Sequence, residues 1–121
     1  MIDRFTEKAK DAIGLAADAA ESLGHHYVGT EHLLIGLIQE GTGVAARVLD
    51  ECGVKEDKVV ELISELISPN NGVGTAERST YTPGARKVIE NSYREAVRFK
   101  APLIGTEHIL SRRPSGLRKT T

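Results

Sequence analysis

The phrase VGTEHLL at residues 28–34 returns almost unchanged as IGTEHIL at residues 104–110. A near-copy of seven residues in a chain of 121 is hard to attribute to chance, so the first question is how far the repetition extends. Moving the sequence by 76 positions aligns about thirty positions without a gap and keeps apolar residues on apolar residues. The chain therefore contains a duplicated structural unit. Other aligned pairs are Phe5 and Tyr81, Thr6 and Thr82, Ala9 and Ala85, Ile13 and Ile89, Ala20 and Ala96, and Leu23 and Phe99.

Apolar residues recur at intervals of three and four, which predicts helices rather than strands. In the first unit the pattern predicts helices over 6–23, 30–40, 43–53 and about 59–67, with Thr6 and Thr30 as N-caps and Gly24 and Gly53 as stops. In the second unit Thr82 as N-cap and Pro83 at the first helical position are typical of a helix start. The expected fold is all-α.

The predicted organisation is one domain over residues 1–110, consisting of a first repeat (1–68), a linker rich in Pro, Gly and Asn (69–80) and a partial second repeat (81–110). After Leu110 the repetition stops. The remaining residues, 111–121, contain Pro114 and four basic residues, so we expect a disordered, solvated tail, although it could also contact nucleic acid or an acidic partner.

An apolar stripe on the helix expected after Pro83 needs a cover, because the second repeat lacks the third and fourth helices that would help to bury it. Either the first repeat covers this stripe, or the chain is marginally stable or self-associates through the incomplete repeat. The stripe consists of Ala85, Val88, Ile89, Ala96 and Phe99.

The composition, with 40% hydrophobic and 27% charged residues and a net charge of -1, is that of a globular protein with no overall bias toward nucleic acid or membrane. No apolar run is long enough for a membrane span, and the N-terminus does not resemble a secretory signal, so we expect a cytoplasmic location. The single cysteine, Cys52, is expected to be a small buried side chain rather than a nucleophile.

Four phrases carry a resemblance to a known family: RFTEKAKDAI (4–13), GHHYVGTEHLLIGLIQEGTGVAARVLDECGV (24–54), YTPGARKVIENSYREA (81–96) and IGTEHIL (104–110). They resemble the duplicated N-terminal repeat domain (Clp N, or Clp R) of ClpC-type ATP-dependent unfoldases. The resemblance implies an all-helical, pseudo-twofold pair of four-helix repeats that receives substrates and adaptors and has no catalytic activity. The sequence contains no G-x-x-x-x-G-K-[ST] phosphate loop, so we expect no ATPase activity and no cofactor.

Thr6, Glu31, Thr82 and Glu107 are the candidate binding residues. A threonine at a helix start offers a hydroxyl beside free backbone N–H groups, which attract phosphate, and a carboxylate can hold a guanidinium through two hydrogen bonds. If the helix starts of one repeat meet, Thr6 and Glu31 would form one site and Thr82 and Glu107 the other. The family resemblance implies phosphoarginine, a mark for degradation, as the ligand.

A simpler interpretation is that each threonine only caps its helix and each glutamate only complements a helix dipole. Between the two candidate sites, the first is expected to be the stronger, because Glu107 stands at the broken edge of the second repeat.

Two other patterns are weighed against ordinary structure. The histidines at 25, 26, 32 and 108 fit no closed metal site, and we expect His32 and His108 to pack or hydrogen-bond between helices. The segment GTGVAA (41–46) matches a dinucleotide fingerprint, but it follows a predicted helix instead of a strand and is interpreted as a turn between helices.

The sequence thus predicts a non-catalytic recognition module of a Clp-type unfoldase, with protein substrates, MecA-like adaptors and phosphoarginine as expected partners, and with no metal, nucleic acid or membrane. The alternatives are a stand-alone helical regulator or an inactive fragment that competes for the adaptors or the unfoldase.

Overall fold

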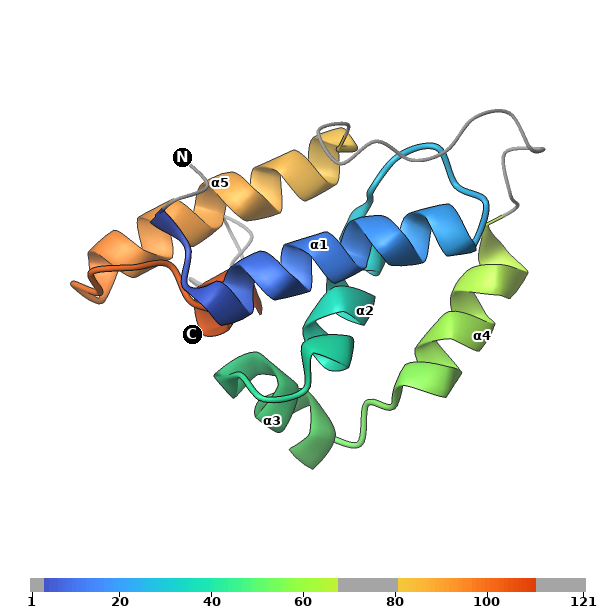
Figure 1. Cartoon of the computed structure of the whole chain (residues 1–121), viewed down its shortest axis with the longest axis horizontal. Coiled ribbons are helices and arrows are strands. Elements are labelled where there is room, and N and C mark those ends of the chain that lie inside the picture. Colours follow the sequence, from blue (N-terminus) through green and yellow to red (C-terminus); the bar gives the residue numbers. More distant parts are fainter. Residues whose placement is uncertain (1–3, 68–80, 111–121) are drawn as a thin grey trace, which may run out of the picture.

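The computed structural model describes residues 4–67 and 81–110, and six α-helices account for most of them (Figure 1). The predicted all-α class is confirmed, with no named strand among the described residues. The predictions for 69–80 and 111–121 lie outside this part of the chain. The helices are α1 (Glu7–Ser22), α2 (Thr30–Glu40), α3 (Val44–Glu51), α4 (Glu56–Leu66), α5 (Pro83–Arg98) and α6 (Thr106–Leu110).

The starts of α1 and α5 follow the local sequence signals. The Thr6 hydroxyl accepts a hydrogen bond from the Ala9 N–H at 3.1 Å, and the Thr82 hydroxyl accepts one from the Ala85 N–H at the same distance. Both threonines have the extended backbone expected of an N-cap, and a proline occupies the first turn of α5. These two predicted caps are confirmed.

The predicted cap of α2 is wrong by one residue. Gly29 is the N-cap and Thr30 the first helical residue, and no side chain of the N-cap residue caps the helix. Instead the ring nitrogen Nδ1 of His32 reaches back and accepts the Gly29 N–H at 2.9 Å. His108 does the same for Gly105 at 2.8 Å, so these histidines bond within their own helix start.

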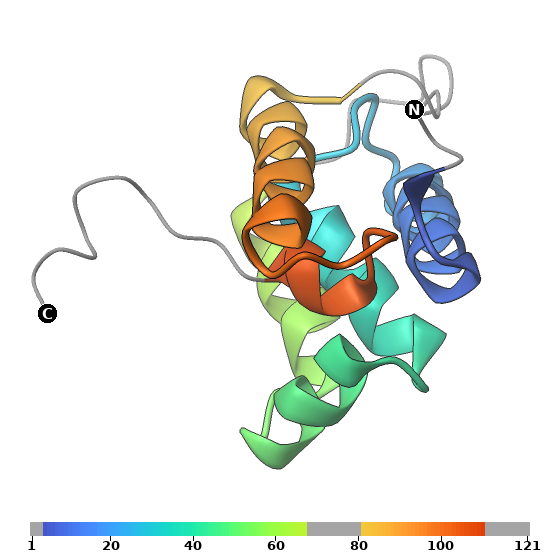
Figure 2. The same ribbon diagram turned by 90° about the vertical axis from the view of Figure 1, so that its left-hand side faces the viewer.

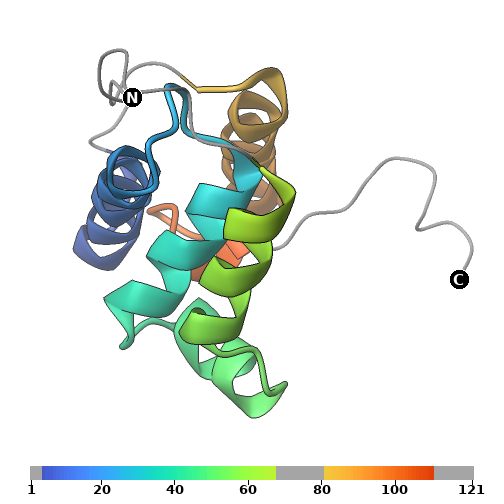
Figure 3. The same ribbon diagram turned by 90° about the vertical axis from the view of Figure 1, so that its right-hand side faces the viewer.

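The pair α1 and α2 forms the centre of the core. α1 buries a stripe made almost entirely of alanine, and Gly36 of α2 faces it so closely that a methyl group at Gly36 would lie 2.1 Å from the Ala12 carbonyl oxygen. α4 runs alongside α2 (Figure 3), while α3 contacts both α2 and α6. Small residues therefore set how closely these helices approach.

Two short parallel bridges join the repeats: Phe5 pairs with Ile104, and Val28 pairs with Tyr81. The 76-residue shift converts one bridge into the other. Matching hydrogen bonds run from the Thr6 N–H to the Ile104 carbonyl and from the Thr82 N–H to the Val28 carbonyl, both at 2.9 Å. The segment before each repeat's first helix is thus paired with the segment before the other repeat's second helix, and α6 lies between α1 and α5 (Figure 2).

The first repeat covers much of the apolar stripe on α5, as one of the two sequence alternatives proposed. Ala85 and Ala96 belong to the same buried cluster as α1 and α2, and Val88 and Ile89 pack against it. The Phe5 and Tyr93 rings lie 5.7 Å apart between centroids. Phe99 differs, because it is 63% exposed.

Cys52 is exposed, so the expectation of a buried thiol is wrong. The last buried side chain of α3 is Leu49, and Cys52 lies beyond it as the C-cap residue, outside the core. No helix in the described part of the chain is both long and apolar enough to cross a membrane.

Candidate functional site

The structure pairs the candidate binding residues across the repeats, whereas the sequence analysis paired them within each repeat. Thr6 and Glu107 line one cleft of about 480 Å³ between the starts of α1 and α6. The Phe5–Ile104 bridge places them there, because it sets the residue before each helix start side by side. The predicted pairing of Thr6 with Glu31 is therefore wrong, since the helix starts that meet belong to opposite repeats.

The cleft shared by Thr6 and Glu107 also contains two cations. Lys8, in the first turn of α1, donates a long hydrogen bond of 3.4 Å to the Thr42 carbonyl, and Arg47 of α3 lines the same space. A helix N-terminus and two cations favour an anion, while the exposed Glu107 carboxylate favours a cation. Neither Lys8 nor Arg47 was among the residues predicted from the sequence. Lys8 could have been found, because it stands two residues after the N-cap Thr6.

Glu107 is well supported, contrary to the expectation that it stands on a broken edge. The Thr106 hydroxyl accepts the Ala45 N–H from α3 at 3.2 Å, and Thr106 itself is buried. On the other side, the Ile104 N–H donates to the Arg4 carbonyl at 2.8 Å. α6 is short, but α3 and the strand-like segment before α1 fix its start from two directions.

The second pair consists of Thr82 and Glu31, brought near each other by the Val28–Tyr81 bridge. A methyl group on Gly84 of α5 would lie 3.6 Å from the Thr30 methyl of α2, which shows how close these two helix starts are. Gly84 stands at the repeat position of Lys8, so this pair lacks the matching cation. The two sites share a backbone plan but differ in charge.

The glycine of each G-T-E-H phrase makes room for the carboxylate. A methyl group on Gly29 would lie 2.7 Å from Glu31 Oε1, and one on Gly105 would lie 2.6 Å from Glu107 Oε1. Both distances are shorter than van der Waals contact, so a larger residue would displace the carboxylate. Each glutamate is thereby held over the backbone at the start of its own helix, where the helix dipole favours a negative charge.

A buried histidine pair lies beneath Glu31. His32 Nε2 is 2.8 Å from His25 Nδ1, and His25 Nε2 is 3.4 Å from the Ile67 carbonyl. Burial, partly opposed by the Glu31 charge, places the pKa of His32 below its ordinary value. Across residues 4–67 and 81–110, no three His, Cys, Asp or Glu side chains are grouped so that they could hold a metal ion.

Solved structures of similar fold include the N-terminal domain of the chaperone ClpD from Arabidopsis thaliana, with a TM-score of 0.72 and 27% identity over 88% of this chain and 73% of that one. The N-domain of ClpV from Vibrio cholerae matches with the same TM-score at 19% identity, over 90% of this chain and 65% of that one, which shows a shared fold alone.

Similar sequences include the negative regulator of genetic competence ClpC/MecB of Bacillus subtilis, which is 43% identical over 110 residues. The chaperone protein ClpB of Oceanobacillus iheyensis is 43% identical over 112 residues. Both matches cover 91% of this chain but only 13% of the relative. The family model of the Clp repeat (R) N-terminal domain matches residues 4–112. The chain belongs to the Clp repeat (R) N-terminal domain family.

Proposed function

We propose that this chain acts by binding, as a recognition module that receives substrate and adaptor proteins for a Clp-type unfoldase. The family assignment supports this role, since the relatives that contain this domain are chaperones and ATP-binding subunits of Clp proteases by name. The chain spans 13% of those relatives. We therefore propose, and do not assign, a link to unfolding and proteolysis by a larger assembly. MecA-like adaptors are among the partners that we propose.

The preferred ligand in this proposal is a phosphoarginine side chain, bound in the cleft between α1 and α6. The observation that carries it is the combination of Lys8, Arg47 and the α1 N-terminus with the Glu107 carboxylate in one cleft. The phosphoryl group would lie against the cations and the free N–H groups after Thr6, while Glu107 would hold the guanidinium. A plain phosphate or an unmodified arginine would satisfy only one end of this cleft.

The pair of Thr82 and Glu31 forms a weaker second site in the same proposal. It offers the same helix N-terminus and a carboxylate that is 30% exposed, but glycine replaces the lysine. The described helices also include no second copy of α3, which carries Arg47, so this site lacks both cations, and their loss from a partly exposed phosphate contact costs on the order of 1 to 2 kcal/mol, about a five- to thirty-fold weaker affinity. The cleft with Glu107 is therefore expected to fill first.

The test is a calorimetric titration of free phosphoarginine into the chain and two matched variants, Glu107→Gln and Glu31→Gln. These substitutions keep the size of the side chain and remove its charge. Glu107→Gln should weaken the tighter binding event by about ten-fold, because a charge-assisted bidentate contact is lost. Glu31→Gln should leave that event nearly unchanged.

Inorganic phosphate and free arginine at matched ionic strength serve as ligand controls, and both should bind more weakly than phosphoarginine. Equal weakening by both variants would show that the two carboxylates do not differ as proposed. If neither variant changes the affinity, or if phosphate binds as well as phosphoarginine, the proposed ligand is wrong.

A further inference from the structure

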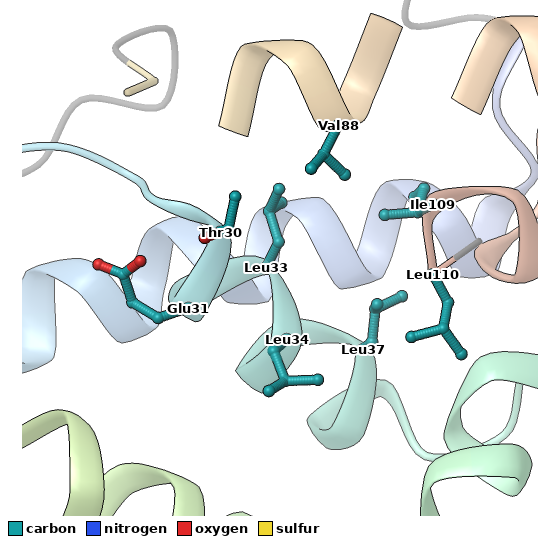
Figure 4. Close-up of a pocket in the computed structure, with 8 residues that line it drawn as sticks. All are labelled: Thr30, Glu31, Leu33, Leu34, Leu37, Val88, Ile109 and Leu110. Atoms are coloured by element: carbon teal, nitrogen blue, oxygen red, sulfur yellow. The ribbon is translucent and has the colours of Figure 1, made fainter. Parts of the chain in front are cut away.

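Two hollows of different character border α6. Figure 4 shows that the first, between α2, α5 and α6, is aliphatic: Val88 points from α5 toward Leu33 of α2, while the Glu31 carboxylate points away. None of the eight residues that line it in the described part of the chain is basic. An anionic ligand is therefore expected in the second hollow, the cleft between α1 and α6 that contains Lys8 and Arg47.

The loop at residues 41–43 forms part of the wall of that cleft. Thr42 and Gly43 line the cleft directly, and Lys8 donates to the Thr42 carbonyl at 3.4 Å. Gly43 is also the N-cap of α3, the helix that carries Arg47. The position of this loop therefore determines where both cations of the cleft lie relative to the start of α1.

Glu40, the last residue of α2, binds this loop from outside the cleft. Its carboxylate accepts hydrogen bonds from the Thr42 N–H at 3.1 Å and the Gly43 N–H at 2.7 Å, and a third from the Thr42 hydroxyl. Gly41, with a φ of 80° in the left-handed region, reverses the chain between the carboxylate and these donors. The Glu40 side chain itself lines a different hollow, between α1 and the end of α2, so it acts on a ligand in the cleft through the loop.

The carboxylate of Glu40 is better suited to the start of α3 than to the end of α2. A negative charge at a helix C-terminus is disfavoured by the helix dipole, whereas one at an N-terminus is favoured. Burial acts to raise the pKa of Glu40, but the hydrogen bonds from Thr42 and Gly43 and the charge of Lys8 outweigh it and place the pKa below its ordinary value of 4.5. The ionised carboxylate thus takes the place of an anion at the N-terminus of α3.

The loop is also held from a second direction. A methyl group on Gly43 would lie 3.0 Å from Glu40 Oε1 and 2.6 Å from the Thr106 hydroxyl oxygen of α6. The same hydroxyl accepts the Ala45 N–H at 3.2 Å. N–H groups at the start of α3 are therefore bound by acceptors from α2 and from α6. Removing the Glu40 contacts should loosen the loop without detaching α3, whose start remains bonded to Thr106.

We infer that Glu40 is a positioning residue for the phosphate-binding end of the cleft. Its carboxylate fixes the loop and, through the loop, Lys8 and the start of α3 with Arg47. Because it occupies the N–H groups of Thr42 and Gly43, it also directs the phosphoryl group to the start of α1. The inference rests on the proposed function and adds a residue that controls the affinity for the phosphoryl group without touching it.

The test compares Glu40→Gln with Glu40→Asp in titrations with phosphoarginine and with inorganic phosphate. Glutamine keeps the length of the side chain but lacks the charge and one of the two acceptor oxygens, so both ligands should bind about five-fold more weakly. Aspartate keeps a carboxylate within reach of the N–H group two residues on, so its affinities should stay within about two-fold of those of the unmodified chain. Glu51→Gln, which removes an exposed carboxylate at the end of α3, controls for charge and should also stay within about two-fold.

Three further measurements separate positioning from a general loss of structure. Free arginine, which meets only the Glu107 end, should bind Glu40→Gln as well as it binds the unmodified chain. In a double-mutant cycle on phosphate affinity, Glu40→Gln and Lys8→Met should be less than additive, because Glu40 acts in part through Lys8. In the ligand-free chain, the amide signals of Thr42 and Gly43 should shift in Glu40→Gln, and circular dichroism should show the helices retained.

Several outcomes would overturn the inference. Tighter phosphate binding by Glu40→Gln would show that the carboxylate only offsets the charge of Lys8. An unchanged phosphate affinity in Glu40→Gln while Lys8→Met weakens it, an equal loss of affinity for arginine and phosphate, or no phosphate binding to the unmodified chain would contradict it as well.

The proposed ligand is decided by separate results, namely the effect of Glu107→Gln and the preference for phosphoarginine over phosphate. If phosphoarginine has no advantage over phosphate, the proposed ligand is wrong. Phosphate binding that weakens in Glu40→Gln and is retained in Glu40→Asp would still support the inference.

Discussion

At the scale of single residues, the hydrogen bonds of the two buried histidines determine which nitrogen of each ring carries the proton. His32 Nδ1 accepts from the Gly29 N–H, so the proton of the neutral ring is on Nε2 and is donated to His25 Nδ1. His25 then has its proton on Nε2, facing the Ile67 carbonyl. This relay connects the start of α2 with the loop after α1 and the end of α4. A second proton on His32 Nδ1 would remove the acceptor of the Gly29 N–H, and the Glu31 carboxylate, 3.9 Å from that nitrogen, only partly offsets this loss.

Acid should therefore destabilise the fold through His32. Its pKa in the folded chain is below the ordinary value of 6.5, so the unfolded chain binds more protons as the pH falls through that value. Stability should be level above about pH 7.5, decrease below about pH 6.5, and level off again once the folded form also takes up the proton. Urea denaturation across this range measures the effect.

The matched variant is His32→Gln, because glutamine at this position can still accept the N-cap N–H but does not titrate. It should be less stable than the unmodified chain at about pH 8, by about 1 kcal/mol for the lost contact with His25. The stability of this variant should also decrease less than that of the unmodified chain when the pH is lowered. An unchanged pH profile in the variant would show that His32 does not cause it.

The residue-scale predictions succeeded where the signal was local. Thr6 and Thr82 cap their helices because a hydroxyl at a helix start needs only its own chain to act. Glu107 acquires its neighbours from α1 and α3, which are distant in sequence, so its pairing with Thr6 was not visible in the spacing. The bond from His32 to His25, in the loop after α1, agrees with the expectation that this histidine links separate segments. Its role as a cap of its own helix was not predicted, because an imidazole that caps its helix leaves the same sequence pattern as one that packs between helices.

At the scale of elements, the α1–α2 contact depends on the absence of side chains. Ala12 and Ala16 of α1 face Gly36 of α2, and a methyl group added at Gly36 would lie 2.9 Å from the Ala16 backbone nitrogen as well as 2.1 Å from the Ala12 carbonyl. Glycine is a poor helix former, costing about 1 kcal/mol relative to alanine. The close packing of the two helices offsets that cost.

Gly36→Ala should destabilise the chain by about 3 kcal/mol, because the clash is with backbone atoms and outweighs the gain in helix propensity. Gly84→Ala provides the control: it is also a helical glycine, but its added methyl group would have an ordinary contact of 3.6 Å with Thr30. That variant should remain within about 1 kcal/mol of the unmodified chain. Equal effects in urea denaturation would contradict the packing argument.

At the scale of the whole molecule, the two repeats are interlocked through their entry segments rather than placed side by side. The repetition, the helices and their approximate ends were predicted, because the apolar periodicity and the glycines that end a helix can be recognised within each segment of the sequence. The pairing of each entry segment with the other repeat was not predicted. The 76-residue shift is equally compatible with helix starts that meet within a repeat and with helix starts that meet between repeats. Only the packed structure distinguishes these arrangements, and the composition of the candidate cleft depends on it.

Because the entry segments of the two repeats pair with each other, we expect the repeats to unfold together. Substitution of Phe5 should lower the free energy of unfolding the most. Phe5 is 4% exposed, pairs with Ile104 of the second repeat, and stacks near Tyr93 of α5. Phe5→Ala should cost about 3 to 4 kcal/mol and should increase amide exchange in α1 and α5 equally. Phe99→Ala, at a 63% exposed ring that contacts Arg98, should cost less than about 1 kcal/mol. If α5 exchanges in Phe5→Ala while α1 and α2 stay protected, the repeats are separate folding units, and the cleft between Thr6 and Glu107 would then not be held rigidly.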